Sequence, residues 1–222
     1  MNEFFITATD TDAGKTYVAR ALVTALVSQG QKVAVYKPVS AGCELIDGQL
    51  VNEDASLLQS CANCQQSISR INPIAFAEPI APHIAAEKSG RQITLSEIMT
   101  GYRQIQTLKA DTVVTEGAGG WRLPLGQGHY LSDFAKQGTF QVILVVNMKL
   151  GCLNHAMLTY EAIKADGLQC VGWVANCQQQ MPYLDENIAE LSQLLPMPLI
   201  ARLGDCLDID EAAALIDTAV LV

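Results

Sequence analysis

The chain of 222 residues has few charged residues and no long apolar run. Charged residues make up 17% and hydrophobic residues 50%, a balance that argues against a disordered chain. No stretch approaches the roughly 18 consecutive apolar residues that a membrane-spanning helix needs. The N-terminus has no basic start, so we expect a first strand there and no signal peptide. Because no repeat, linker or low-complexity segment interrupts the sequence, we expect a single domain over residues 1–222.

Positive charge is also scarce. Lys and Arg total 14 against 23 Asp and Glu, which gives a formal net charge of −9. An acidic surface argues against nucleic acid or an anionic membrane as the main partner. It does not argue against a nucleotide, because phosphate recognition is local and uses backbone N–H groups.

The seven cysteines are odd in number and irregularly spaced, so we expect reduced thiols in the cytoplasm. One close pair, Cys61 and Cys64, has the spacing of a redox motif or of half a zinc site. A zinc site needs a second cysteine pair or suitably spaced histidines, and the sequence has neither. Two incidental thiols at a helix end are the better interpretation.

Short apolar runs alternate along the chain with segments of helical spacing. Strands are expected at 4–8, 32–36, 112–116, 142–146, 171–175 and 199–201. Helices are expected at 15–29, 54–61, 81–89, 95–108, 154–165, 183–195 and 210–219, and a surface excursion at 43–52. The alternation, with fully apolar strands, predicts an α/β fold in which helices cover both faces of a parallel sheet. Ligands of such sheets bind at the carboxyl ends of the strands.

The segment 8–16, after the first expected strand, is similar to a phosphate-binding loop. That pattern has a leading glycine and ends in Gly-Lys-Ser/Thr. Here Gly14, Lys15 and Thr16 are present, and Ala8 stands in place of the leading glycine. Backbone N–H groups at the helix start would cradle phosphate, Lys15 would reach the β- and γ-phosphates, and Thr16 would ligate Mg²⁺. The alternative is a strand–turn–helix with a surface lysine, which the flanking strand, the helix and Gly30 as its C-terminal cap disfavour.

Polar residues also follow the next expected strands. Lys37 comes after the second strand, where a second lysine would neutralise charge on a transferring phosphoryl group; a solvent-exposed lysine is the alternative. Glu116 ends the third strand and suits a Mg²⁺ ligand, and the glycines after it allow a ligand to approach the backbone; a helix-cap role is the alternative. Asp54 could complete the metal site or only match the dipole of its helix, and its spacing does not decide.

Two more features belong to the expected ligand edge. Gly151–Asn154 would form a helix N-terminus, which is a second place to hold an anion. Asn176 ends the fifth strand, where its amide could pair with the edge of adenine. His83, His129 and His155 are assigned no role, because such histidines are more often structural.

Together these segments resemble the dethiobiotin synthetase family over nearly the whole chain. The most specific strings are Glu116–Trp121 and Lys149–His155, since many families share the phosphate loop. Further matches lie at Thr9–Thr16, Tyr36–Val39, Asn72-Pro73, Phe76–Pro79, Pro82-His83 and Gly172–Asn176. The resemblance implies a P-loop NTPase fold and an ATP-dependent cyclo-ligase of biotin biosynthesis that forms C–N bonds. Such an enzyme joins 7,8-diaminononanoate and CO₂ through a carbamate and a carbamic–phosphoric anhydride.

The resemblance also implies roles for individual residues, with ATP and Mg²⁺ as cofactors. Lys37, Lys15 and Thr11 would be catalytic, and Thr16, Asp54 and Glu116 would hold Mg²⁺. Besides Lys15, Thr16, Asp54 and Glu116, nucleotide contacts would come from Asp12, Ala13, Gly14, Tyr17, Gly117, Ala118, Gly119, Asn176, Cys177, Gly204, Asp205, Cys206 and Glu211. The substrate would contact Ser40, Ala41 and, from the partner subunit of a homodimer, Gly151, Cys152, Leu153 and Asn154.

Four positions depart from the usual pattern of that family. Ala8 adds a methyl group where glycine is usual, and Ala41 removes a hydroxyl group beside Ser40. Gly204 replaces a proline near the adenine, which bears on base preference. Asn187 stands where a tyrosine is expected at the carboxylate site, although Tyr183 is one turn away.

Three other functions compete with this interpretation. A membrane- or DNA-partitioning ATPase of related fold typically carries a signature lysine early in the phosphate loop, where this chain has Asp10. An amidating synthetase of the cobyrinate type usually carries a glutaminase domain, for which 222 residues leave no room. A degenerate relative that binds nucleotide without turnover is suggested by Ala8 and Ala41.

Overall fold

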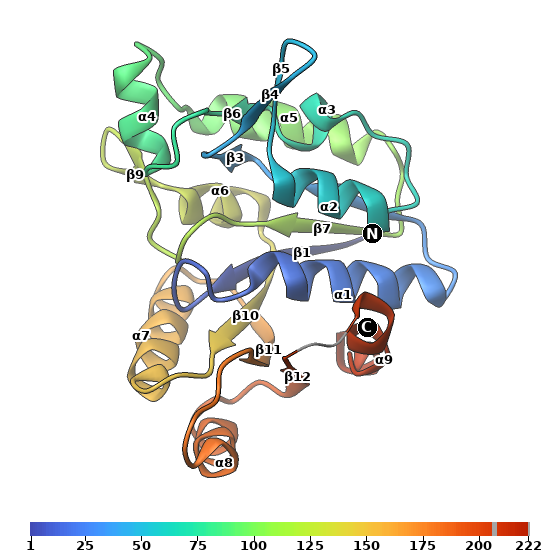
Figure 1. The fold of residues 1–222 in the computed structure, drawn as a ribbon, viewed down its shortest axis with the longest axis vertical. Coiled ribbons are helices and arrows are strands. Elements are labelled where there is room, and N and C mark those ends of the chain that lie inside the picture. Colours follow the sequence, from blue (N-terminus) through green and yellow to red (C-terminus); the bar gives the residue numbers. More distant parts are fainter. Residues whose placement is uncertain (206–207, 222) are drawn as a thin grey trace.

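The computed structural model describes residues 1–205 and 208–221, and a six-stranded parallel β-sheet forms its centre (Figure 1). The strands lie in the order β12–β11–β10–β1–β7–β2. Their bounds are β1 Asn2–Ala8, β2 Val33–Tyr36, β7 Thr112–Glu116, β10 Gln141–Asn147, β11 Cys170–Cys177 and β12 Leu199–Gly204. Because β1 lies between β7 and β10, the sheet grows in opposite directions on its two sides. The carboxyl end of β1 is therefore the place where such sheets bind ligands.

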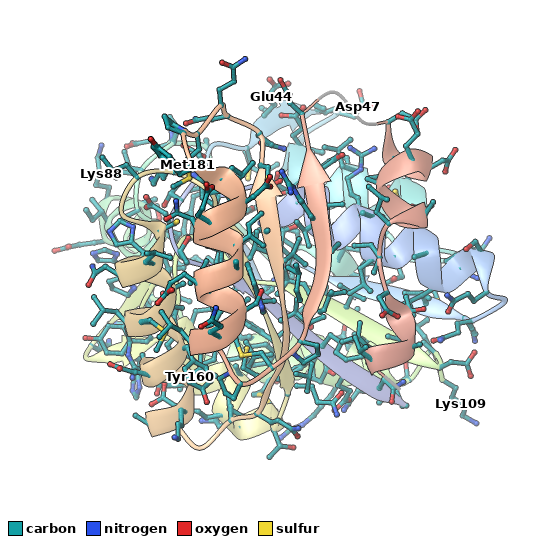
Figure 2. The ribbon with its side chains drawn as sticks, turned by 90° about the horizontal axis from the view of Figure 1, so that it is seen from below. Glu44, Asp47, Lys88, Lys109, Tyr160 and Met181 are labelled. Atoms are coloured by element: carbon teal, nitrogen blue, oxygen red, sulfur yellow. The ribbon has the colours of Figure 1, made fainter. Side chains whose placement is uncertain are left out.

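Helices cover both faces of this sheet. Their bounds are α1 Lys15–Ser28, α2 Glu53–Cys61, α3 Ile68–Ile71, α4 Pro82–Lys88, α5 Leu95–Gln106, α6 Leu131–Gly138, α7 Cys152–Ala165, α8 Leu184–Leu194 and α9 Ile209–Ala214, followed by the 3₁₀ helix η1 Thr218–Leu221. Helices α1 and α9 pack on one face, and α5, α6 and α7 on the other. Figure 2 shows α7 and α8 side by side. Among the described residues, no helix combines the length and apolar character needed to cross a membrane.

Short strands outside the main sheet shape its carboxyl edge. They are β3 Val39–Ser40 with β6 Ile74–Ala75, β4 Glu44–Ile46 with β5 Gln49–Val51, and β8 Pro124–Gly126 with β9 His129–Tyr130. The exposed β4–β5 hairpin is the expected surface excursion at 43–52. The close cysteine pair also agrees with expectation, since α2 ends at Cys61 and both Cys61 and Cys64 are free thiols.

The central strand shows why the sheet strands are continuously apolar in the sequence. Successive side chains of a strand point to opposite faces, and helices cover both faces here. Phe4 and Ile6 belong to the core under α1, whereas Phe5 lies between Trp121, Phe134 and Phe140 on the other face. The ring centroids of these three residues lie 5.9 to 6.3 Å from that of Phe5.

All the expected strands are present, and the predicted α/β architecture is confirmed. The expected helix at 210–219 was wrong in its second half, because α9 ends at Ala214. The chain then returns to the sheet, where the Asp217 N–H donates to Ile200 O at 2.9 Å and Gln29 Nε2 donates to Thr218 Oγ1 at 2.6 Å. Helices α3 and α6 were not predicted: α3 has only four residues, whereas the buried Leu131, Phe134 and Ala135 of α6 do have helical spacing.

Candidate active site

The phosphate-binding loop connects β1 to α1 at the carboxyl edge. Gly14 is the N-cap of α1 at φ +84°, and a Cβ atom there would lie 2.0 Å from Asn176 Nδ2. Both the backbone conformation and the lack of space therefore require glycine. Among the described residues, no side chain caps α1, so its first N–H groups are available to an anion. Ala8 is fully buried at the end of β1 and pairs with Val145, so the methyl group is accommodated in the core.

The other predicted loop residues differ in exposure. Thr11 and Asp12 form its exposed tip, Ala13 is buried beneath them, and Tyr17 is half-buried against the α1 core. Lys15 is 7% exposed, and its Nζ donates to Asp10 O at 3.4 Å. Burial lowers the pKa of Lys15 to about 8, and repulsion from the nearby Lys37 adds to this shift.

Lys37 lies between the two carboxylates that were predicted to hold the metal. Its Nζ donates to Glu116 Oε1 at 2.6 Å, to Asp54 Oδ2 at 3.0 Å and to Gly117 O at 3.3 Å. The Thr16 hydroxyl donates to the same Glu116 Oε1 at 2.9 Å. Burial disfavours the charge on Lys37, but attraction to Glu116 and Asp54 outweighs it and raises the pKa of Lys37. Burial would raise the pKa of Asp54, yet Lys37 holds it below its ordinary value.

These side chains fit a magnesium ion that binds together with a triphosphate. Glu116 is 1% exposed, and its buried Oε2 atom has no hydrogen-bond partner among the described residues. A buried carboxylate oxygen of this kind is costly unless a donor or cation satisfies it. The described residues contain no group of three or more His, Cys, Asp or Glu that could hold a metal. Mg²⁺ is suited to such a site, because it is commonly held by one or two carboxylates and substrate phosphates.

A cleft of about 810 Å³ opens above these groups. The predicted residues that line it are Thr11, Asp12, Gly14, Lys15, Thr16, Lys37, Ser40, Ala41, Asp54, Glu116, Ala118 and Gly119. The structure thus brings together four segments that are distant in the chain. The remaining lining residues were not predicted from the sequence, and they are Asn52, Pro79, Ile80, Ala81, Pro82 and Leu123.

Two of these unpredicted residues, Asn52 and Pro82, are of types that commonly begin a helix. Asn52 is the N-cap of α2, and its side chain accepts a hydrogen bond from the Ala55 N–H at 3.3 Å. Asn is a favoured N-cap residue, so the start of this helix was readable from the sequence. Pro82 at the first turn of α4 is a comparable helix-start signal. Leu123 has no such signal.

The hydroxyl group of Ser40 is held by the scaffold around Lys37. Ser40 is 3% exposed, and its Oγ donates to Asn72 Oδ1 at 2.6 Å, with Cys43 Sγ at 3.1 Å. Asn72 Nδ2 in turn donates to Lys37 O at 2.7 Å. Ser40 and Ala41 border the cleft, but this hydroxyl already has a partner. A substrate contact by these two residues stays a prediction.

Asn176 supports the phosphate loop from beneath. It is 1% exposed, and its Nδ2 donates to Ala13 O at 2.8 Å. Its buried Oδ1 has no hydrogen-bond partner in the part of the chain that the structure describes. The expected contact with adenine stays a prediction. Cys177 and Asp205 line a second cavity of about 740 Å³ beside the ends of β11 and β12. Cys177 is buried, and burial raises the pKa of its thiol.

The last predicted nucleotide residues lie after β12. A Cβ atom on Gly204 would meet no atom of the described residues within 4 Å, so these residues leave space for a larger side chain. Glu211 forms a capping box with Asp208 at the start of α9, with hydrogen bonds of 2.8 and 3.1 Å. Cys206 lies outside the described residues.

The start of α7 does not line the cleft of its own chain. Gly151 is the exposed N-cap at φ +94°, Cys152 is buried, Leu153 is half-buried and Asn154 is exposed. The neighbouring Leu150 is 94% exposed. A role for this helix start in substrate binding therefore needs a second chain.

Comparison with known proteins gives a consistent result. A family model described as an AAA domain matches residues 2–213. The chain is 50% identical over 204 residues to the ATP-dependent dethiobiotin synthetase BioD of Aeromonas salmonicida, covering 91% of this chain and 90% of that protein. It is 49% identical over 214 residues to the BioD protein of Alteromonas mediterranea, covering 91% and 92% of the two chains.

Solved structures at low identity share the fold. The MinC:MinD cell division protein complex of Aquifex aeolicus aligns with a TM-score of 0.59 at 13% identity, covering 98% of this chain and 88% of that chain. The cell division protein FtsY of Thermotoga maritima aligns with a TM-score of 0.52 at 13% identity, covering 100% and 68%. At these identities the likeness concerns the fold alone.

Proposed function

The chain belongs to the family of ATP-dependent dethiobiotin synthetases, and we propose that it joins 7,8-diaminononanoate and CO₂ into dethiobiotin in the cleft above the phosphate loop. As a member of this family it is an ATP-dependent ligase of biotin biosynthesis. One observation supports the proposed site most strongly: Lys37, Glu116, Asp54 and Thr16 form one hydrogen-bonded group beside Lys15.

The proposed reaction has two bond-forming stages after the diamine has formed a carbamate with CO₂. A carbamate oxygen attacks the γ-phosphorus of ATP, and the bond to the bridging oxygen of ADP breaks. The second amine then attacks the carbonyl carbon of the mixed anhydride, and phosphate leaves as the cyclic urea closes. Such transfers depend mainly on placement and charge neutralisation.

The side chains in the cleft supply both requirements. The raised pKa of Lys37 favours its charged form, and an ammonium group at this place suits electrostatic stabilisation of the transferring phosphoryl group. Lys15 would bind the β- and γ-phosphates, and the N–H groups at the start of α1 would hold their oxygens. Thr16, Asp54 and Glu116 would hold Mg²⁺, which neutralises phosphate charge when bound. The segment 79–82 and Leu123 border the cleft and would help to exclude water.

The proposal includes a homodimer. Gly151–Asn154 cannot contribute to the cleft of their own chain, as the lining residues show. Leu150, Leu158 and Tyr183 are 94%, 57% and 75% exposed, and a dimer interface at α7 and the start of α8 would remove such side chains from water. A second subunit that covers them would bring the start of α7, which no described side chain caps, to the carboxylate of the substrate.

Phosphate release tests the proposed function. Purified protein receives ATP, Mg²⁺ and bicarbonate, with and without 7,8-diaminononanoate. We expect phosphate release to require the diamine and to match dethiobiotin formation one to one. Release that ignores the diamine would contradict the synthetase function, and ATP binding without release would favour a degenerate relative.

A further inference from the structure

An ion pair ties the front of the phosphate loop to the connection between β10 and α7. Lys149 Nζ lies 2.7 Å from Asp10 Oδ2, and the two side chains are 35% and 45% exposed. The hydrogen bond from Lys149 lowers the pKa of Asp10. The Asn147 N–H also donates to Thr9 Oγ1 at 3.3 Å. Two polar contacts thus join the same two segments.

Asp10 also contacts Thr11 and Lys15, two residues that the sequence predicts to be catalytic. Its Oδ1 accepts a hydrogen bond from the Thr11 N–H at 2.8 Å, and its backbone oxygen accepts one from Lys15 Nζ at 3.4 Å. The side-chain Oδ1 and the backbone oxygen of Asp10 thus each accept one hydrogen bond from the loop. A rotation of the Asp10 side chain would release the Thr11 N–H, which is next to the backbone oxygen that accepts from Lys15.

We propose that Lys149 is a positioning residue for the phosphate loop, which it holds in its binding conformation through Asp10. The loop tip at Thr11 and Asp12 is exposed, so little packing orders it. A tether that orders it in advance lowers the entropy lost when the nucleotide binds. The inference rests on the proposed function only in that this loop binds ATP.

The opposing interpretation is a surface ion pair without a role. Partly exposed ion pairs contribute little to stability, so replacement of Lys149 should not unfold the chain. ATP affinity therefore separates the two interpretations, and thermal unfolding serves as the check that each variant is folded.

The experiment measures the Kd of Mg²⁺–ATP by calorimetry, without diamine or bicarbonate. Lys149→Met should weaken binding about two- to fivefold, and Lys149→Arg should restore most of the affinity. Asp10→Asn keeps the acceptor for the Thr11 N–H but loses its charge, and it should weaken binding to a similar degree. Both changes remove the same ion pair between Lys149 and Asp10. The double variant should therefore lose no more ATP affinity than the single variant with the larger loss.

Lys32→Met is the matched control, since Lys32 Nζ donates to Leu108 O at 2.6 Å at the opposite edge of the sheet. It should bind ATP as the wild type does. An unchanged Kd for Lys149→Met would overturn the inference, and so would additive losses in the double variant. Tighter binding by Asp10→Asn would also overturn it, because the negative charge of Asp10 would then oppose the nucleotide more than its contact with Lys149 favours binding.

The outcomes separate this inference from the proposed function. A wild type that binds ATP but lacks diamine-dependent phosphate release contradicts the proposed function and leaves the comparison of Lys149 variants intact. Turnover with an unchanged Lys149→Met affinity contradicts only the positioning role. A wild type that fails to bind ATP overturns both.

Discussion

At the scale of single residues, two ammonium groups and two carboxylates lie together at the floor of the cleft, where most of them are buried. Lys15 and Lys37 respond in opposite ways to burial. The pKa of Lys15 falls to about 8, because burial dominates and Lys37 repels it. The pKa of Lys37 rises, because Glu116 and Asp54 offset its burial. Both ammonium groups are therefore mainly charged at pH 7, and Lys15 would gain from an arriving phosphate the opposite charge that Glu116 and Asp54 already give Lys37.

This difference leads to a prediction for Lys37→Ala. We expect kcat for phosphate release to fall about 100-fold or more, because a preorganised charge at the transferring group is lost. The Kd for Mg²⁺–ATP should change far less, since Lys15 and the start of α1 remain. The measurement is single-turnover phosphate release beside calorimetric ATP binding. Lys164→Ala, an exposed lysine in the last turn of α7, is the control, and equal losses in kcat and affinity for Lys37→Ala would argue against its role.

At the scale of elements, the strand pattern predicted most of the site. Parallel strands end at one edge, so Gly14, Lys37 and Glu116 were expected together, and the structure places them there. The spacing of Asp54 did not decide whether it lies at the metal site or only at a helix start. The structure places its Oδ2 atom 3.0 Å from Lys37 Nζ. The Ser40 hydroxyl could not be placed, because its partner Asn72 is 32 residues away and no local periodicity links them.

A second contact of this kind fixes the end of the glycine-rich loop after β7. Asp166, which caps α7, accepts hydrogen bonds from Trp121 Nε1 at 2.9 Å and from Arg122 Nη2 at 3.2 Å, and Lys136 Nζ lies 3.6 Å away. Burial would raise the pKa of Asp166, but the hydrogen bonds from Arg122 and Trp121 outweigh it and hold this pKa below its ordinary value. The ion-paired carboxylate therefore joins α7 to the loop that lines the cleft.

The depressed pKa of Asp166 gives a prediction with a defined sign. A group whose pKa is lower in the folded chain stabilises the fold above its unfolded pKa, and this stability is lost as pH falls through its folded pKa. The free energy of unfolding should thus be higher for the wild type than for Asp166→Asn at pH 7. The difference should shrink below about pH 4. Urea unfolding at several pH values measures it, and a difference that grows on acidification would contradict the assignment.

At the scale of the whole molecule, the cleft of one chain is bordered by the segment 79–82 but not by the start of α7. The family resemblance assigned Ser40, Ala41 and the start of α7 to the substrate. Only Ser40 and Ala41 line the cleft of the same chain. Spacing along one chain carries no information about a second chain. The homodimer therefore stays a prediction that the exposed apolar side chains support.

The dimer prediction is testable through Leu158, which is 57% exposed and lies four residues after Asn154, so the two share a face of α7. Leu158→Glu should place a charge in the interface, where desolvating it is costly, and should convert dimers to monomers at micromolar concentration. Sedimentation equilibrium measures the mass, and Leu215→Glu, at a 50% exposed residue after α9, is the control. Because the residues predicted to bind the nucleotide all come from one chain, ATP affinity should persist in the monomer, whereas KM for the diamine should rise. A wild type that is already monomeric, or a monomeric variant with an unchanged KM for the diamine, would show that the start of α7 has no part in substrate binding.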